Sequence, residues 1–366
     1  MTRARRRIAV VLGGRSSEHA ISVASAESVI EALADAHDVV TVEIARDGTW
    51  ALGSGSSETR RLAARASAGV SETATSGVRS LATSRTDTHA GLAAAGRLPD
   101  RGVAAALADV DVVFPVLHGP FGEDGTLQGL LELAGVPFVG AGVLASALCM
   151  DKDVFKSVMR DHGIPVTRNV TLRTADEPRN PFGYPVFVKP ARLGSSVGIT
   201  KAHDDRELEA AVELAFEHDE KVLVEEFVRG REIEVGVLGN RSPIASIPGE
   251  IVVTHNEWYD YEAKYDEGEM DLLVPPRISE EQIERAQELA VRAFVATDCE
   301  GMARADMFVR EDGEVLVNEL NTIPGFTATS VYAKLFDASG IRYHELLDRL
   351  VDLALERHER RSRLRY

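Results

Sequence analysis

The feature that most constrains this chain lies near its C-terminal end, where two runs of alternating apolar and polar residues flank an Asp-Gly pair. The runs cover residues 299–309 and 314–322, and Asp312 and Gly313 separate them. This alternation predicts an antiparallel β-hairpin, because successive side chains of a strand point to opposite faces and an Asp-Gly pair favours a tight turn. We therefore expect a two-residue turn at Asp312 and Gly313.

That turn determines which residues of the two strands face each other. It places Asp306 opposite Glu319 and Arg304 opposite Asn321, with all four side chains on one face. Directly opposed carboxylates destabilise a sheet by roughly 0.2–1 kcal/mol, so a cation is expected between them. The oxygen ligands Asp306, Glu319 and Asn321 suit a hard ion such as Mg²⁺ that is bound mainly through a substrate's phosphates. Taken alone, the segment fits a solvated polar face of a sheet equally well.

Length, charge and cysteine content bound the class of protein. A chain of 366 residues, 44% of them apolar, is expected to form two or three domains with substantial cores. Its net charge of −17 and pI near 5.1 argue against nucleic acid or an anionic membrane as the main partner. Cys149 and Cys299 are too few for a disulfide framework, which favours the cytoplasm. The apolar run at 8–12 is too short for a secretory signal, and no segment approaches the roughly 20 apolar residues of a membrane span.

The first 142 residues alternate between short apolar runs and helical segments, which predicts an α/β domain. Strands are expected over residues 8–12, 39–44, 110–116 and 136–139, and helices from about 17 to 33 and from 126 to 134. Ser16 or Ser17 is expected to cap the first helix. Residues 53–102 are rich in Ser, Ala, Thr, Gly and Arg, and no aromatic residue occurs between Trp50 and Phe114. That stretch is predicted to be a poorly ordered insertion rather than a catalytic lid.

Two further units are expected, a central one over residues 143–228 and a C-terminal one over residues 229–366. The central unit is predicted to contain helices over 144–162 and 207–216, strands ending at 190 and 227, and a Gly-Ser loop at 194–198. The C-terminal unit is predicted to contain strands over 232–238 and 244–253, a polar, aromatic loop over 255–269, a helix opened by a capping box at 279–282, the hairpin and two terminal helices.

Polar residues of the central unit have the types and positions of a nucleotide site. The loop at 194–198 could wrap phosphates with backbone N–H groups and hydroxyls, although it is neither a Walker A nor a Rossmann fingerprint and also fits a plain turn. Lys152 and Lys189 lie beside this loop at the boundaries of predicted elements. They could be phosphate ligands or ordinary surface lysines. Glu225 and Glu232 lie at the end of an apolar strand and in the segment after it. Their spacing suits carboxylates that bind an amino group and a ribose, and it fits an exposed hinge as well.

The N-terminal unit has two polar segments at strand ends. Residues 118–126 contain His118, two acidic residues and several glycines between a buried strand and a helix. Because α/β sheets bind ligands at the carboxyl ends of their strands, this segment favours a functional role over a mere connection. Glu18 lies at the other such strand end, where a carboxylate either binds a ligand or only complements the helix dipole.

In their order along the chain, these segments resemble the D-alanine-D-alanine ligases of the ATP-grasp superfamily over nearly the whole sequence. The matching motifs are residues 13–18, 118–129, 150–152, 188–190, 194–198, 259–265, 304–306 and 318–327. Each motif alone is modest, and their order makes the match specific. The resemblance implies an α/β (α+β overall) three-domain ATP-grasp architecture with an N-terminal parallel sheet, and ATP between the central and C-terminal units. The chain departs from the family in residues 53–102, which are longer than the family needs, and at Glu226, a hinge position whose side chain varies in the family.

The resemblance also implies roles for individual residues. ATP would be bound by Lys152, Lys189, Ser195, Ser196, Glu225, Glu226 through its backbone, Val228, Glu232 and Lys264. Two Mg²⁺ or Mn²⁺ ions would be bound by Asp306, Glu319 and Asn321. The catalytic residues would be Glu18, Ser195, Tyr265, Arg304 and Gly325, and the substrate would be lined by His118, Ser330 and Val331.

The implied reaction joins two D-alanine molecules to D-alanyl-D-alanine through an acyl phosphate, for peptidoglycan synthesis in the cytoplasm, with a homodimer as a possible assembly. The nearest alternative is a ligase that takes D-lactate or D-serine second, and the hydroxyl of Tyr265 favours an amine nucleophile. A regulatory protein that binds ATP without turnover would not need Glu18, Arg304 and the metal ligands. A dehydrogenase would need the third glycine and the acidic residue of the Rossmann fingerprint.

Overall fold

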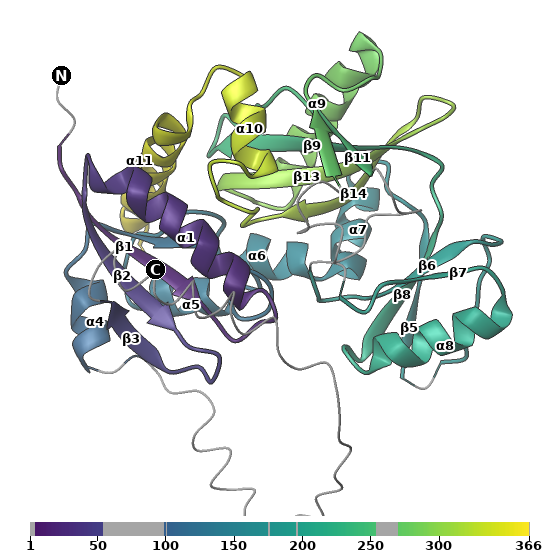
Figure 1. Cartoon of the computed structure of the whole chain (residues 1–366), viewed down its shortest axis with the longest axis horizontal. Coiled ribbons are helices and arrows are strands. Elements are labelled where there is room, and N and C mark those ends of the chain that lie inside the picture. The colour runs from purple at the N-terminus through teal and green to yellow at the C-terminus, as the bar shows by residue number, and fades with distance from the viewer. Residues whose placement is uncertain are drawn as a thin grey trace, which may run out of the picture.

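The computed structural model describes residues 4–53, 99, 101–174, 176–194, 197–253 and 270–365. Its framework consists of three β-sheets that follow one another along the chain, with helices packed against them (Figure 1). In the described ranges, no helix is both long enough and apolar enough to cross a membrane.

The N-terminal sheet is parallel at its centre. Strands β1 (Arg7–Gly13), β2 (Asp38–Ile44) and β4 (Val112–Pro115) run parallel, β3 (Trp50–Gly53) pairs antiparallel with β2, and the strand order is β3-β2-β1-β4. The helices are α1 (His19–Ala34), α4 (Arg101–Ala108) and α5 (Thr126–Leu133). All of β1 after its first residue is buried, as expected for a parallel strand that is covered on both faces. The α/β class predicted for this unit is therefore confirmed.

The start of α1 differs from the prediction. Neither Ser16 nor Ser17 is the capping residue, because Glu18 occupies the N-cap position and no side chain makes a capping bond there. The Ser16 hydroxyl instead donates to the carbonyl of His118 at 2.7 Å. This serine thus links the two strand ends of the sheet rather than starting a helix.

Two other predicted segments of this unit have different boundaries. Residues 136–139 are not a strand and make one isolated bridge to β4. Of the expected insertion, residues 54–98 and 100 lie outside the described residues, while Gly53 is the last residue of β3 and Arg101 the first of α4.

The central unit is an antiparallel sheet with helices beside it. Its strands are β5 (Asn169–Arg173), β6 (Val186–Pro190), β7 (Thr200–Ala202) and β8 (Lys221–Glu226), in the order β5-β8-β6-β7, and α8 (Asp205–Phe216) packs on β6 and β7. The single helix predicted over 144–162 is two helices, α6 (Val143–Met150) and α7 (Lys152–Asp161). Asp151 is extended between them, and its side chain accepts the N–H of Val154 as the N-cap of α7.

The C-terminal unit is built on a larger antiparallel sheet. Its strands are β9 (Gly230–Gly239), β10 (Ile244–Ala245), β11 (Gly249–Val253), β12 (Met270–Leu273), β13 (Gly301–Arg310) and β14 (Val315–Asn321), in the order β12-β11-β9-β13-β14 with β10 on β9. The helices are α9 (Glu280–Ala296), α10 (Val331–Ala338) and α11 (Tyr343–Ser362). The predicted capping box is confirmed, because Ser279 and Gln282 each bond the other's backbone N–H.

The predicted hairpin is formed by β13 and β14. Its register is confirmed at the expected metal ligands, because Asp306 pairs with Glu319. The prediction of a two-residue turn is wrong. Arg310 pairs with Glu314, so three residues form the connection, and the last of them, Gly313, has a φ of 93° that favours glycine. A β-bulge then places one extra residue, Asn318, in β14. The longer turn shifts the pairing by one residue and the bulge restores it.

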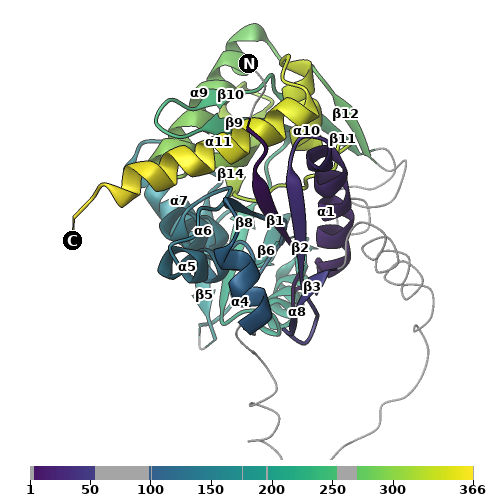
Figure 2. The same cartoon turned by 90° about the vertical axis from the view of Figure 1, so that its left-hand side faces the viewer.

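One hydrophobic cluster joins the two ends of the chain. It contains buried residues of β1 and α1 together with Leu346, Leu350 and Ala354 of α11. Helix α11 packs against α1, α10 and β4. Figure 2 shows it as the long yellow helix that leads from beside α10 to the C-terminus. The first strand and the last helix of the chain thus contribute to the same core.

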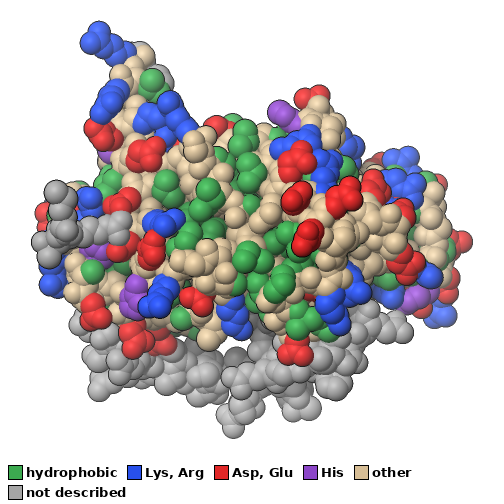
Figure 3. All heavy atoms as spheres, turned by 90° about the horizontal axis from the view of Figure 1, so that it is seen from above, with side chains coloured by type: hydrophobic (Ala, Val, Ile, Leu, Met, Phe, Trp, Pro, Cys, Tyr) green, Lys and Arg blue, Asp and Glu red, His purple; other side chains and the backbone are tan. Residues whose placement is uncertain are grey.

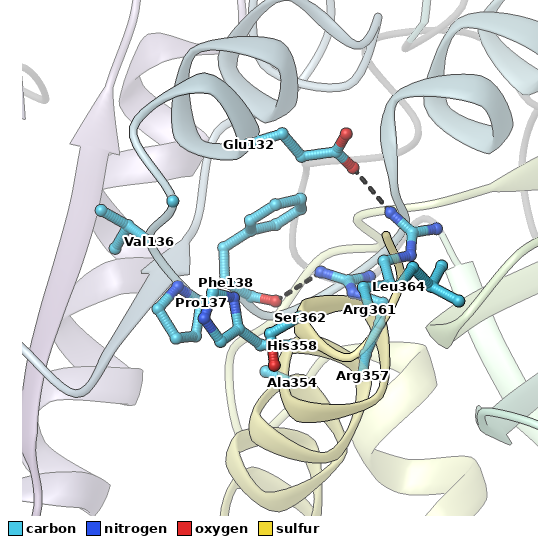
Figure 4. Close-up of a pocket in the computed structure, with 11 residues that line it drawn as sticks. Glu132, Val136, Pro137, Phe138, Ala354, Arg357, His358, Arg361, Ser362 and Leu364 are labelled. Atoms are coloured by element: carbon cyan, nitrogen blue, oxygen red, sulfur yellow. Dashed lines mark hydrogen bonds and ion pairs between the residues drawn. The ribbon is translucent and has the colours of Figure 1, made fainter. Parts of the chain in front are cut away.

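Arginines attach the end of α11 to the N-terminal unit (Figure 4). The buried guanidinium of Arg357 donates to the carbonyls of Phe138, at 2.7 Å, and Gly140, and lies 4.4 Å from the centre of the Phe138 ring. Burial lowers the pKa of Arg357 to about 10. Arg361 pairs with Glu132 of α5 at 2.8 Å. These contacts surround a cavity of about 440 Å³.

Charges of both signs intermingle on the face seen from above in Figure 3, and apolar side chains occupy its middle. Many of the ion pairs join neighbours on one helix, such as Arg349 with Glu345 on α11. Such exposed pairs contribute little individually to stability.

Candidate active site

A row of carboxylates crosses three adjacent strands of the C-terminal sheet. Asp306 of β13 lies opposite Glu234 of β9 on one side and Glu319 of β14 on the other. Arg304, two residues earlier on the same face, donates to both oxygens of Asp306 at 2.7 Å and lies 3.0 Å from Glu234. The amide of Asn321 also donates to Asp306, at 2.9 Å. The sequence-predicted ligands and the predicted Arg304 are therefore in one cluster.

The donor set of this cluster fits a hard divalent cation. Asp306 and Glu319 supply carboxylate oxygens and Asn321 an amide oxygen, which are ligands that Mg²⁺ and Mn²⁺ accept. Within the described ranges, no group of three or more His, Cys, Asp or Glu side chains forms a ready metal site. Two carboxylates and an amide suit an ion that arrives with additional ligands, such as phosphate oxygens.

Two lysines enclose a buried carboxylate near the end of β8, an inner strand of the central sheet. Lys189 of β6 and Lys156 of α7 approach the two oxygens of Glu225 at 2.5 and 2.7 Å, respectively. Burial lowers the pKa of Lys156 to about 8. Burial opposes ionisation of Glu225, yet the two ammonium groups hold its pKa below the ordinary value. Lys189 also donates to the side chain of Asn318, the extra residue of the bulge, at 3.4 Å.

Lys152 links three segments around the same space. Its ammonium group donates to the carbonyl of Leu193 at 2.6 Å and lies 3.5 Å from Glu319. Its backbone N–H donates to the carbonyl of Ala191. Lys152 therefore brings the start of α7 and the beginning of the Gly-Ser loop next to the carboxylate row.

The residues between β8 and β9 connect the central and C-terminal units. The carboxylate of Glu226 pairs with Arg168 and, at 2.8 Å, with Arg310 of β13. Burial opposes its ionisation, but these guanidinium groups keep its pKa low. Val228 follows, half-buried, and Glu232 lies on β9 two residues before Glu234. The Glu226 side chain is thus occupied by arginines, in keeping with a binding role for its backbone alone.

The loop after β4 lies against the residues that follow β14. Nδ1 of His118 bonds the carbonyl of Ile323 at 3.0 Å. Because a carbonyl only accepts, Nδ1 carries the proton and Nε2 of the neutral ring is an acceptor. Burial lowers the pKa of His118, which keeps the ring neutral. Nε2 is buried and has no hydrogen-bond partner in the described part of the chain.

Glu123 of this loop makes two backbone contacts. Its carboxylate accepts the N–H of Gly119 at 2.7 Å and the N–H of Ile323 at 3.1 Å. Burial, followed by the charge of nearby Glu18, raises its pKa to about 8, while the two N–H donors oppose that shift.

Glu18 lies between the N-terminal loop and the Gly-Ser loop. Gly119 has a φ of 71°, and a Cβ atom there would lie 2.5 Å from Oε2 of Glu18. A Cβ atom at Gly194 would lie 3.3 Å from the same oxygen. The backbone of both loops therefore comes close to Glu18 only because these positions are glycine.

Ser330 and Gly325 lie together in the turn before α10. The Ser330 hydroxyl accepts the N–H of Thr327 at 3.0 Å and lies 2.7 Å from its hydroxyl. A Cβ atom at Gly325 would be 3.4 Å from the Ser330 hydroxyl, and Val331 begins α10. The predicted site residues Ser195, Ser196, Lys264 and Tyr265 lie outside the described residues.

Comparison with known proteins identifies the family of this chain. The family models described as the N-terminus and the C-terminus of D-ala D-ala ligase match residues 7–141 and 158–352. The chain belongs to the D-alanine-D-alanine ligase family. The ligase of Streptomyces avermitilis is 47% identical over 96% of this chain and 94% of its own length, and that of Geobacillus thermodenitrificans is 42% identical over 98% of each.

Solved ligase structures have the same fold. The D-alanine-D-alanine ligase of Coxiella burnetii superposes with a TM-score of 0.79 and 36% identity over 98% of this chain and 96% of that one. The VanG D-Ala:D-Ser ligase of Enterococcus faecalis gives 0.77 and 38% over 96% and 100%, and the Bacillus anthracis ligase complexed with ATP gives 0.70 and 25% over 97% and 99%. The ATP-grasp fold predicted from the motifs is confirmed.

The structure adds three residues that the sequence analysis did not select in this ligase. Glu234 lies two residues after Glu232 on the same strand face. The two-residue period of a strand could therefore have indicated Glu234 as a site residue. Lys156 lies four residues after Lys152 on α7, and residues at this spacing share one helix face. The helical period could therefore have indicated Lys156 as a neighbour of the site. Glu123 was inside the motif at 118–126, but no sequence pattern indicates that it contacts Ile323.

Proposed function

We propose that this chain joins two D-alanine molecules to D-alanyl-D-alanine with cleavage of ATP to ADP and phosphate, through a D-alanyl phosphate. The arrangement that carries the proposal is the carboxylate row of β9, β13 and β14, with Arg304 on the same face and Lys152 and Lys189 beside it. Opposed carboxylates next to cationic groups suit a metal-bound nucleotide and a charged transition state.

In this proposal, ATP lies between the central and C-terminal units. Its phosphates are held by Lys152, Lys189, Lys264 and the loop of Ser195 and Ser196, and its nucleoside by Glu225, the Glu226 backbone, Val228 and Glu232. Asp306, Glu319 and Asn321 would hold two Mg²⁺ or Mn²⁺ ions, which would supply charge neutralisation for the phosphates. The lysines now paired to Glu225 and Glu319 are the groups that phosphates would draw away.

The first D-alanine binds with its ammonium group at Glu18. Its carboxylate oxygen attacks the γ-phosphorus, the bond to the β-phosphate oxygen breaks, and ADP leaves. Arg304 and the N–H of Gly325 stabilise the oxyanion that forms when the second amine attacks the acyl carbon. Collapse of that intermediate releases phosphate.

The second D-alanine binds by its carboxylate at Ser330, with Val331 and His118 lining its pocket. Its amine must lose a proton, and Ser195 and Tyr265, together with Glu18, form the proposed relay. Neutral His118, with Nε2 as an acceptor, suits a neighbouring ammonium group rather than an anion. We place the reaction in the cytoplasm, with a homodimer as the proposed assembly.

A D-alanine-D-serine ligase is the second candidate, because the VanG D-Ala:D-Ser ligase superposes nearly as well as the Coxiella enzyme. The test is to incubate the protein with ATP and Mg²⁺ and with D-alanine alone or with added D-serine or D-lactate, and to identify products by mass. We expect ADP and D-alanyl-D-alanine as the dominant products. A dominant D-alanyl-D-serine or D-alanyl-D-lactate would replace the substrate assignment, and ADP formation without any dipeptide or depsipeptide would reject ligase activity.

A further inference from the structure

Ile323 is held through both of its backbone groups by one loop of the N-terminal unit. Its carbonyl accepts from His118 at 3.0 Å, and its N–H donates to Glu123 at 3.1 Å. The residue itself is buried, and its neighbours toward the N-terminus end β14 at Asn321. Two contacts from one loop therefore fix the position of the chain just after the carboxylate row.

Glu123 also fixes the loop from which it comes. Its second oxygen accepts the N–H of Gly119, the residue whose backbone lies against Glu18. One carboxylate thus bridges the segment near Glu18 and the segment between Asn321 and Gly325. Each of the two carboxyl oxygens accepts one of these N–H groups, so the bridge needs both oxygens.

We propose that Glu123 is a positioning residue that sets the end of β14, and hence Asn321 and the Gly325 N–H, relative to the first-substrate loop. This inference rests on the proposed function, because it assigns reacting atoms to both segments. Glu123 contacts neither of those residues and acts through Ile323. Displacement of a catalytic group by about 1 Å costs on the order of a hundredfold in rate, so loss of the bridge is expected to lower kcat.

The adjacent Asp124 is a matched control. It also accepts two backbone N–H groups, from Phe121 at 2.8 Å in its own loop and from Thr126 at 3.0 Å at the start of α5, and both belong to the N-terminal unit. A change of acid to amide therefore removes the same chemistry from either residue. Only Glu123 reaches the C-terminal unit, so a difference between the two variants reports the bridge rather than the loop.

The experiment compares E123Q, E123D and D124N with the wild type. E123Q presents an NH₂ group to one of the two N–H donors. E123D keeps both carboxyl oxygens but is one methylene shorter, so it can retain Gly119 and lose Ile323. We expect kcat to fall about ten- to a hundredfold in both Glu123 variants, with the KM for ATP within about twofold of wild type. D124N is expected to stay within about threefold of wild-type kcat.

Thermal unfolding and calorimetric ADP binding accompany the kinetics, and all assays are run well below each Tm. Wild-type kcat in E123Q and E123D, or an equal loss in D124N, would overturn the positioning role. A raised KM for ATP at unchanged kcat, or weakened ADP binding, would also overturn it, because the effect would then lie in the nucleotide site. Failure of the proposed function is distinct, since the wild type itself would form no dipeptide.

Discussion

Arg304 occupies the position of a counter-ion in the carboxylate row. It bonds both oxygens of Asp306 and approaches Glu234, so the sheet carries its own cation between opposed acids. Such pairing offsets the repulsion expected between carboxylates on adjacent strands. Glu319, at the other side of Asp306, lies 3.5 Å from the ammonium group of Lys152.

Replacing Glu319 with Gln should therefore weaken the use of Mg-ATP without unfolding the hairpin, since the two side chains are nearly isosteric. Loss of an anionic ligand is expected to raise the Mg²⁺ concentration needed for half-maximal ADP release by roughly ten- to a hundredfold. A Mg²⁺ titration of ADP release measures this. Glu314→Gln, at an exposed pair with Arg310 in the same hairpin, is the control and should behave as wild type. An unchanged Mg²⁺ requirement in Glu319→Gln would remove this residue from the metal site.

Residue pairing in the hairpin could be predicted from sequence only in part. The alternation of apolar and polar residues indicated which side chains share a face, and the structure confirms that Asp306 meets Glu319. The turn length was not predictable, because Asp-Gly also fits a three-residue connection that ends in a positive φ. The bulged residue, Asn318, accepts a hydrogen bond from Lys189, which lies 129 residues earlier, and no local pattern indicates such a contact.

At the scale of elements, Glu250 of β11 links its own strand to β9 and to the segment before α9. Its carboxylate accepts from Arg277 at 2.7 Å, ahead of α9, and from Arg231 of β9 at 2.6 Å. Hydrogen bonds from Arg277 lower its pKa to about 2, from an ordinary 4.5. A depressed pKa means that the stabilisation is complete above pH 4.5 and is lost as the pH falls from 4.5 toward 2.

Glu250→Gln should accordingly lower the free energy of unfolding at pH 7 by on the order of 2–3 kcal/mol. The difference from wild type should shrink as the pH falls below 4.5, because the unfolded wild-type chain then binds a proton at Glu250 while the folded protein, with its pKa near 2, does not. Urea unfolding at several pH values between 7 and 3 measures it. Glu288→Gln, in an exposed pair on α9, should have little effect. A difference that stays constant down to pH 3 would contradict the role of this ion pair.

Element boundaries were predictable where local chemistry sets them and not elsewhere. The capping box of α9 is a local signal and was confirmed. The break at Asp151 was not, because residues on both sides of it favour a helix and the interruption brings Lys152 to the carbonyl of Leu193. The boundaries of the three expected domains remain predictions.

At the scale of the whole molecule, Arg357 joins α11 to the segment after α5. Replacing it with Met would leave the carbonyls of Phe138 and Gly140 without their donor in a buried place. We expect a loss of about 2–4 kcal/mol in the free energy of unfolding, seen as a Tm lower by several degrees. Arg363→Met, at the C-cap of the same helix with an exposed partner, is the control and should leave the Tm unchanged. Equal Tm values for the two variants would show that the contact does not hold the units together.

The cluster shared by β1, α1 and α11 also sets a timetable for synthesis. β1 ends at Gly13 and α11 begins at Tyr343, so roughly 330 residues are made between them. At about 5–20 residues per second, the first strand emerges some 15–65 s before the last helix of its cluster. Helix α1 can pack on β1 early, but the apolar side chains of α1 and β4 that face α11 lack that neighbour until translation is almost complete. A ribosome that stops before α11 releases a chain with an incomplete N-terminal core, whose apolar surface is open to chaperones and to other nascent chains.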